Sequence, residues 1–129
     1  MSALANAFMS RKSFLHGKGV MPEQIAEAEK QLGLSFSDEY REYLTAYGIV
    51  AYDGHELTGI TKSNRLNVVA VTTEARKKQP GIPDNFYVIE EVGIEELIIM
   101  QNEQGEIYGC APNYKPKKIC DSLHDYVSK

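Results

Sequence analysis

Two short amphipathic segments, residues 25–33 and 38–47, follow one another directly and restrict the fold more than any other part of the chain. Apolar side chains recur in each at three- and four-residue spacing, the pattern of a helix with one buried stripe. Ser37 is a suitable N-cap for the second helix, and Gly33 and Gly48 are suitable stops. Because helices this short are marginal alone, both stripes must pack against residues later in the chain. The stripes consist of Ile25, Ala28 and Leu32, and of Tyr40, Tyr43, Leu44 and Tyr47.

The remainder of the chain is dominated by strand patterns. The run Leu97–Met100 is apolar on both faces, which places it at the centre of a sheet. We therefore expect an α+β fold, with a mostly antiparallel sheet of about five to six strands and helices packed mainly on one face. The predicted strands are residues 49–52, 56–60, 66–71, 86–92, 97–101 and 107–111, and short helices are predicted at 72–77 and 121–127.

The N-terminal residues predict a small separate piece. Residues 1–19 indicate a short helix with Leu4 and Phe8 facing inward, followed by a flexible connection at residues 16–19. Residues 20–129 then form the main domain. A chain of 129 residues suits one domain that needs neither disulfides nor a metal.

Four features in a fixed order carry a family resemblance. They are Ala28-Glu29 inside the first helix, the link Leu34-x-Phe36, the helix Asp38–Tyr47 closed by Gly48, and the later Gly54-x-Glu56-Leu57-x-Gly59. Over residues 20–128 the chain resembles the SUKH superfamily of Smi/Knr-like domains, although the family usually has proline where Ser37 stands. The family is found in a fungal cell-wall-synthesis regulator and in many bacterial immunity proteins, so the resemblance implies a protein-binding domain.

Charge and cysteine content exclude several classes of protein. The net charge of −4 argues against nucleic-acid binding, which draws its affinity from clustered lysine and arginine. We find no signal peptide and no membrane-spanning run, and Cys110 and Cys120 are too few for a secreted disulfide framework. These observations predict a cytoplasmic protein. A single disulfide between the two cysteines remains an alternative to two small buried thiols.

No residue pattern indicates an enzyme. His55 and Glu56 suggest a proton-transfer pair, but adjacent residues of a strand point to opposite faces. The three histidines and two cysteines have no metal-site spacing, Cys110 has no neighbouring base, and no glycine-rich turn joins a strand to a helix. Tyrosines could stack on bases, but Tyr40 and Tyr43 repeat at helical spacing, which favours core packing. The sequence thus predicts no catalytic residue, no metal and no cofactor.

Acidic residues are distributed unevenly along the chain. Residues 84–106 contain seven Asp or Glu and no Lys or Arg: Asp84, Glu90, Glu91, Glu95, Glu96, Glu103 and Glu106. Two interpretations remain open, a solvated strand face partly balanced by Arg76, Lys77 and Lys78, and an acidic docking surface for a basic partner.

The docking interpretation agrees with what the resemblance implies. Bacterial SUKH proteins are frequently immunity partners of polymorphic toxins, many of them nucleases with basic clefts. On this hypothesis the chain is an antitoxin that occludes the active site of a cognate nuclease toxin, without chemistry of its own. The alternative is a regulatory scaffold similar to the fungal regulator, and an apolar edge strand would also support a homodimer. The candidate toxin-binding residues are Glu90, Glu91, Glu95 and Glu96, with Asp53 and Glu56 as outlying candidates.

Overall fold

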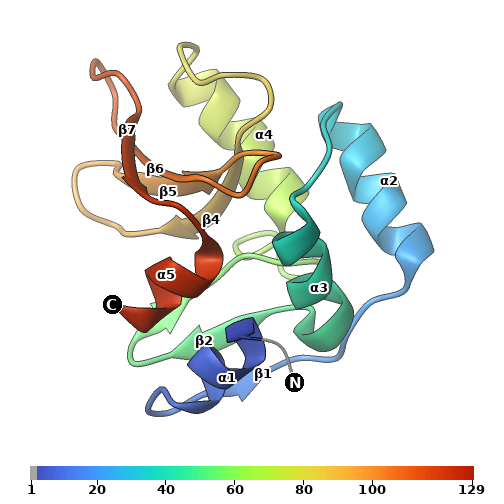
Figure 1. Cartoon of the computed structure of the whole chain (residues 1–129). Helices are drawn as coiled ribbons and strands as arrows, with labels where there is room; N and C mark the ends of the chain where they lie inside the picture. The colour runs from blue at the N-terminus through green and yellow to red at the C-terminus, as the bar shows by residue number, and fades with distance from the viewer. Residues whose placement is uncertain (1–2) are drawn as a thin grey trace.

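The computed structural model describes residues 3–129 and places five helices and seven strands in them. In chain order these are α1 (Ala3–Met9), β1 (Leu15–His16), α2 (Pro22–Leu32), α3 (Asp38–Tyr47), β2 (Val50–Tyr52), β3 (His55–Glu56), α4 (Val68–Lys78), β4 (Tyr87–Glu91), β5 (Ile98–Gln101), β6 (Ile107–Cys110), β7 (Lys117–Cys120) and α5 (Leu123–Ser128). Figure 1 shows the elements along the chain. The mixed fold is as predicted.

The strands form two antiparallel sheets, which corrects the prediction of one sheet of five to six strands. β1, β2 and β3 make a three-stranded sheet, and β4, β5, β6 and β7 make a four-stranded one. β3 has only two residues, and its backbone continuation contacts β4 at Thr58, whose N–H donates to the Ile89 carbonyl at 2.8 Å. The chain then turns away at Gly59, so no ladder forms between the two sheets.

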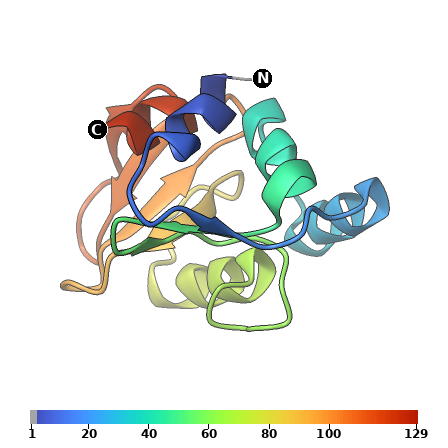
Figure 2. The ribbon, with the colours of Figure 1, turned by 90° about the horizontal axis from the view of Figure 1, so that it is seen from below.

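Helices cover both faces of the four-stranded sheet, which corrects the prediction that they pack mainly on one. Figure 2 shows α4 below the strands and α1, α3 and α5 above them. Ile99 and Ile107 pack in the core on the side of α3 and α5, whereas Ile98, Met100 and Cys110 pack on the side of α4. β5 is therefore buried on both faces, as its apolar run predicts. The edge strand β7, by contrast, is largely exposed.

α2 and α3 form where the sequence predicts them. Gly33 ends α2 in the left-handed region at φ 67°. Ser37 caps α3, since its hydroxyl accepts a hydrogen bond from the Tyr40 N–H at 3.0 Å. Glu29 fixes the link between the helices by accepting from the Phe36 N–H at 2.8 Å. The apolar stripes predicted for the two helices are buried, except that Tyr47 is half-buried.

The buried tyrosines form the centre of the core, as their helical spacing predicts. Tyr40, Tyr43 and Tyr87 are fully buried, and each hydroxyl has a partner. Tyr43 donates to the Thr58 carbonyl at 2.5 Å, and Tyr87 donates to Gln101 Oε1 at 2.8 Å. Burial raises the pKa of all three phenols, so these hydroxyls stay protonated and able to donate. These rings are not available to stack on bases.

Residues 66–78 contain the largest error of the secondary-structure prediction. The predicted strand at 66–71 and short helix at 72–77 are one helix, α4. Asn67 begins it, because its side-chain oxygen accepts from the backbone N–H groups of Val69 and Ala70 at 3.0 and 3.2 Å. Val71 and Ala75 lie one turn apart and pack on the sheet. β7 was also not predicted, because its sequence, residues 117–120, does not alternate between apolar and polar side chains.

The N-terminal segment is attached along its length. Leu4 and Phe8 of α1 are buried as predicted, and α1 packs beside α5. In the predicted connection at 16–19, His16 pairs with β2, and the Gly17 N–H donates to the Ile49 carbonyl at 3.0 Å. Residues 16 and 17 are therefore hydrogen-bonded to the domain. Residues 1 and 2 of this predicted piece lie outside the described residues.

Candidate functional site

Three of the predicted docking acids lie together where β4 turns into β5. Glu91 ends β4, and Glu95 and Glu96 lie in the turn that follows. All three are exposed, and none forms an ion pair within residues 3–129. The turn stands out from the body in Figures 1 and 2. We call residues 91–96 the acidic turn.

The tip of the acidic turn combines charge with an exposed apolar side chain. Ile94 has 65% of its surface exposed. Glu95 and Glu96 have φ angles of 52° and 59°, in the left-handed region that residues with a Cβ seldom adopt. The backbone is held by hydrogen bonds from the Leu97 N–H to the Ile94 carbonyl at 2.9 Å and from the Val92 N–H to the Leu97 carbonyl at 3.2 Å. The turn thus presents Ile94 between carboxylates.

Glu90, the fourth predicted acid, is buried. Its residue exposure is 5%, and its carboxylate accepts hydrogen bonds from His55 Nδ1 at 3.0 Å and from the Tyr126 hydroxyl at 2.6 Å. Burial, and then the hydrogen bond to Glu90, raises the pKa of Tyr126, which keeps this hydroxyl a donor. Burial, followed by the nearby Glu90 charge, raises the pKa of Tyr52 to about 12. Glu90 therefore joins β4 to β3 and α5 and does not reach the surface.

The two outlying candidates have cationic partners. Asp53 accepts from Arg11 at 2.9 Å, and Glu56 holds Arg65 through two bonds of 2.8 and 3.1 Å. Glu56 and Arg65 line a small hollow together with Glu91. The structure therefore brings Glu56 close to the acidic turn, whereas Asp53 lies apart in the turn between β2 and β3.

The bond between Arg65 and Glu56 gives a testable titration. The hydrogen bond from Arg65 lowers the pKa of the Glu56 carboxyl. Arg65→Ala should therefore raise the Glu56 pKa toward its ordinary value, which an NMR titration of the side-chain carboxyl would follow. Arg41→Ala is the matched control, because Arg41 pairs with Glu29 and Asp38 instead. An unchanged Glu56 pKa in Arg65→Ala would contradict the pairing.

His55 and Glu56 do not share a site, as the strand geometry predicts. His55 bonds Glu90 on one side of β3, and Glu56 bonds Arg65 on the other. Sequence reasoning missed the cluster of His55, Glu90 and Tyr126, because its members lie at least 35 residues apart. Both cysteines are free, and burial raises the pKa of Cys110 to about 11, which keeps the thiol protonated at neutral pH.

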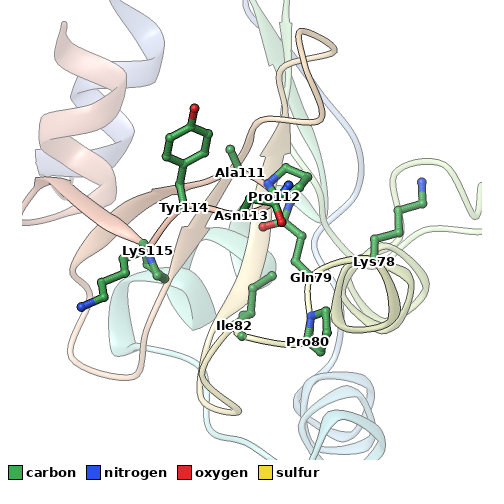
Figure 3. Close-up of a pocket in the computed structure, with 11 residues that line it drawn as sticks. Lys78, Gln79, Pro80, Ile82, Ala111, Pro112, Asn113, Tyr114 and Lys115 are labelled. Carbon is green, nitrogen blue, oxygen red and sulfur yellow. The ribbon is translucent and has the colours of Figure 1, made fainter.

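A pocket of about 440 Å³ lies close to the acidic turn. One wall is the loop after α4, with Pro80 and Ile82, and the other is the loop between β6 and β7, with Pro112 and Tyr114. Figure 3 shows Lys78 and Lys115 on opposite sides of it. Tyr114 is 79% exposed. Sequence reasoning did not find this pocket, because two separate loops form it.

Within residues 3–129, no group of three or more His, Cys, Asp or Glu is arranged to hold a metal ion. No helix in the same residues has the length and apolar character needed to cross a membrane. The surface features considered below are the acidic turn and the neighbouring pocket.

Comparisons with known proteins identify the family. The SUKH_5 family model, described as SMI1-KNR4 cell-wall, matches residues 5–129. The fold is similar to the crystal structure of a protein from Pseudomonas syringae pv. tomato, with a TM-score of 0.75, 17% sequence identity, and coverage of 96% of this chain and 92% of that chain. A comparison with curated proteins found no match. Because the family model covers nearly the whole sequence, the chain belongs to the SUKH (SMI1-KNR4) family, as the resemblance predicted.

Proposed function

We propose that this chain is an immunity protein that binds a cognate toxin in the cytoplasm and blocks the toxin's active site. Membership of a family that includes immunity proteins supports the proposal. The observation that carries it is the acidic turn, where Glu91, Glu95 and Glu96 are exposed and form no ion pair within residues 3–129. Neighbouring carboxylates outside ion pairs repel one another, and a cationic surface would relieve that repulsion.

The charge of the turn indicates the chemistry of the partner. A nuclease binds its substrate in a cleft lined by lysine and arginine, which neutralise phosphates. The acidic turn presents three carboxylates and the apolar side chain of Ile94, and these could occupy such a cleft in place of nucleic acid. Complementary charge also speeds encounter, which matters when a free toxin is lethal. Inhibition of this kind requires no catalytic group on the chain.

Charge reversal tests the proposal. The unaltered chain should rescue cells that express a toxin from a neighbouring gene, and the triple variant Glu91→Lys, Glu95→Lys and Glu96→Lys should lose this rescue. It should also weaken the purified complex by at least about 100-fold, because like charges then meet. The matched control reverses Glu27, Glu42 and Glu103, which are exposed acids elsewhere with the same total charge. Rescue lost equally in the control would remove the acidic turn from the interface, and no rescue by the unaltered chain would refute the function.

The description of the family model favours a second candidate, a regulatory scaffold for cell-wall synthesis. Such a scaffold would bind a host protein through the same turn and would need no toxin. The neighbouring genes distinguish the two candidates. A large toxin gene with a variable C-terminal domain immediately upstream supports immunity, and its absence supports the scaffold.

A further inference from the structure

The pocket beside the acidic turn has a charge opposite to that of the whole chain. Lys78 and Lys115 flank it, are exposed, and form no ion pair within residues 3–129. Its interior is lined by apolar atoms of Pro80, Ile82 and Pro112. A ligand that fits must therefore combine an apolar side chain with negative charge on both sides.

The acidic turn has the same combination. Ile94 is 65% exposed and is followed directly by Glu95 and Glu96. The turn and the pocket also adjoin each other, because Gln79 lines the pocket and donates from Nε2 to the Glu96 carbonyl at 3.3 Å. Lys78 likewise lines both the pocket and a hollow beside Glu91 and Glu96. One face of the molecule thus carries a projection and a pocket of opposite charge.

We propose that the pocket receives the acidic turn of a second copy of this chain. Ile94 of one copy enters between the Pro80–Ile82 loop and Pro112 of the other, and Glu95 and Glu96 pair with Lys78 and Lys115. Every copy carries both halves side by side on one face, so a two-fold axis satisfies both contacts at once and closes the assembly as a dimer. The result is a dimer with two equal turn-in-pocket contacts.

The size and charge of these contacts set the strength of the dimer. Two turns and two pockets bury less than the roughly 800 Å² per partner of a standard interface, so we expect a weak, concentration-dependent dimer. Its ion pairs are exposed at the rim, and salt screens them over about 10 Å at 0.1 M. The same turn carries the acids proposed to bind a toxin, so toxin and second copy exclude each other. The dimer itself requires no toxin.

Sedimentation velocity on the full chain tests the dimer. At about 50 mM salt the sedimentation coefficient should rise with protein concentration toward that of a dimer, and about 500 mM salt should weaken the association at least about 10-fold. Ile94→Ala should weaken it by a similar factor without affecting the charges. A monomer at all concentrations, or growth beyond a dimer, would refute the proposal.

Charge exchange between pocket and turn tests the pairing itself. The pocket variant Lys78→Glu with Lys115→Glu and the turn variant Glu95→Lys with Glu96→Lys should each be monomeric, because like charges meet in both of their contacts. An equimolar mixture of the two should form a mixed dimer, in which both contacts are again between opposite charges. All four positions are exposed, and unchanged circular dichroism melts would confirm that the variants fold. Failure of the mixture to associate would refute the pairing.

Discussion

Replacing Gly59 with alanine should lower the free energy of unfolding by at least about 3 kcal/mol. A Cβ at this position would overlap the Gly48 carbonyl oxygen and press on the Ile49 side chain. The collision is with backbone, and the same carbonyl accepts from the Ile60 N–H at 3.2 Å. Gly59 is also bridged to Asn67, so the backbone has little room to move. Urea denaturation followed by circular dichroism measures the loss.

Gly81→Ala is the matched control for this substitution. Among the described residues, no heavy atom lies within 4 Å of the position a Cβ would take at Gly81, and the backbone is outside the left-handed region. We expect a change within about 0.5 kcal/mol, or a slight gain from a less flexible unfolded chain. Equal effects of the two substitutions would show that the close approach of residues 48 and 59 contributes nothing to stability.

The elements that sequence predicted well are those whose signals are local. α3 begins and ends where predicted, because Ser37 supplies the cap and Gly48 the stop within a few residues of the stripe. The hairpin of β2 and β3 follows from Asp53-Gly54, whose positive φ angles of 45° and 83° suit a tight turn. β5 was predicted from its run of apolar residues, which indicates a strand buried on both faces, and all four of its residues are buried. In each case the signal lies within the element or in the residues next to it.

The errors arise where distant residues decide. Val68, Val69 and Val71 have strand propensity, but they form a helix whose apolar side meets the four-stranded sheet. The Asn67 cap was a local signal that the prediction overlooked. The division into two sheets is accompanied by a close approach of Gly59 to the Gly48 carbonyl, which no local pattern reveals. Propensity is a weak guide where packing between distant segments sets the conformation.

The placement of the candidate acids could be predicted only in part, for the same reason, and their role in binding stays a prediction. A run of acids without neighbouring cations is visible in sequence, and Glu91, Glu95 and Glu96 are indeed exposed and close together. The sequence could not show that Glu90 is buried and Glu91 exposed. The burial of Glu90 depends on a bulge between Val88 and Glu90 and on hydrogen-bond partners in β3 and α5. The ion pair of Glu56 could not be predicted either, because Arg65 lies 9 residues further along the chain, in the loop before α4.

Glu90→Ala should be the second most destabilising of the substitutions considered, with a loss of about 2 to 4 kcal/mol in the free energy of unfolding. The side chain is 7% exposed, and its removal leaves His55 Nδ1 and the Tyr126 hydroxyl without their acceptor. Unpaired polar groups that stay partly buried lose their hydrogen bonds without regaining full hydration. Tyr126 would also lose its link from α5 to β4. Urea denaturation at neutral pH measures the effect.

Two further variants isolate the cause of that loss. Glu91→Ala, at the exposed neighbour, should change stability by no more than about 0.5 kcal/mol. Combining Glu90→Ala with Tyr126→Phe should cost less than the sum of the single substitutions, because both remove the same 2.6 Å hydrogen bond. Strict additivity would mean that the bond contributes nothing and that Glu90 acts through His55 alone. A loss below about 0.5 kcal/mol for Glu90→Ala itself would contradict the buried network.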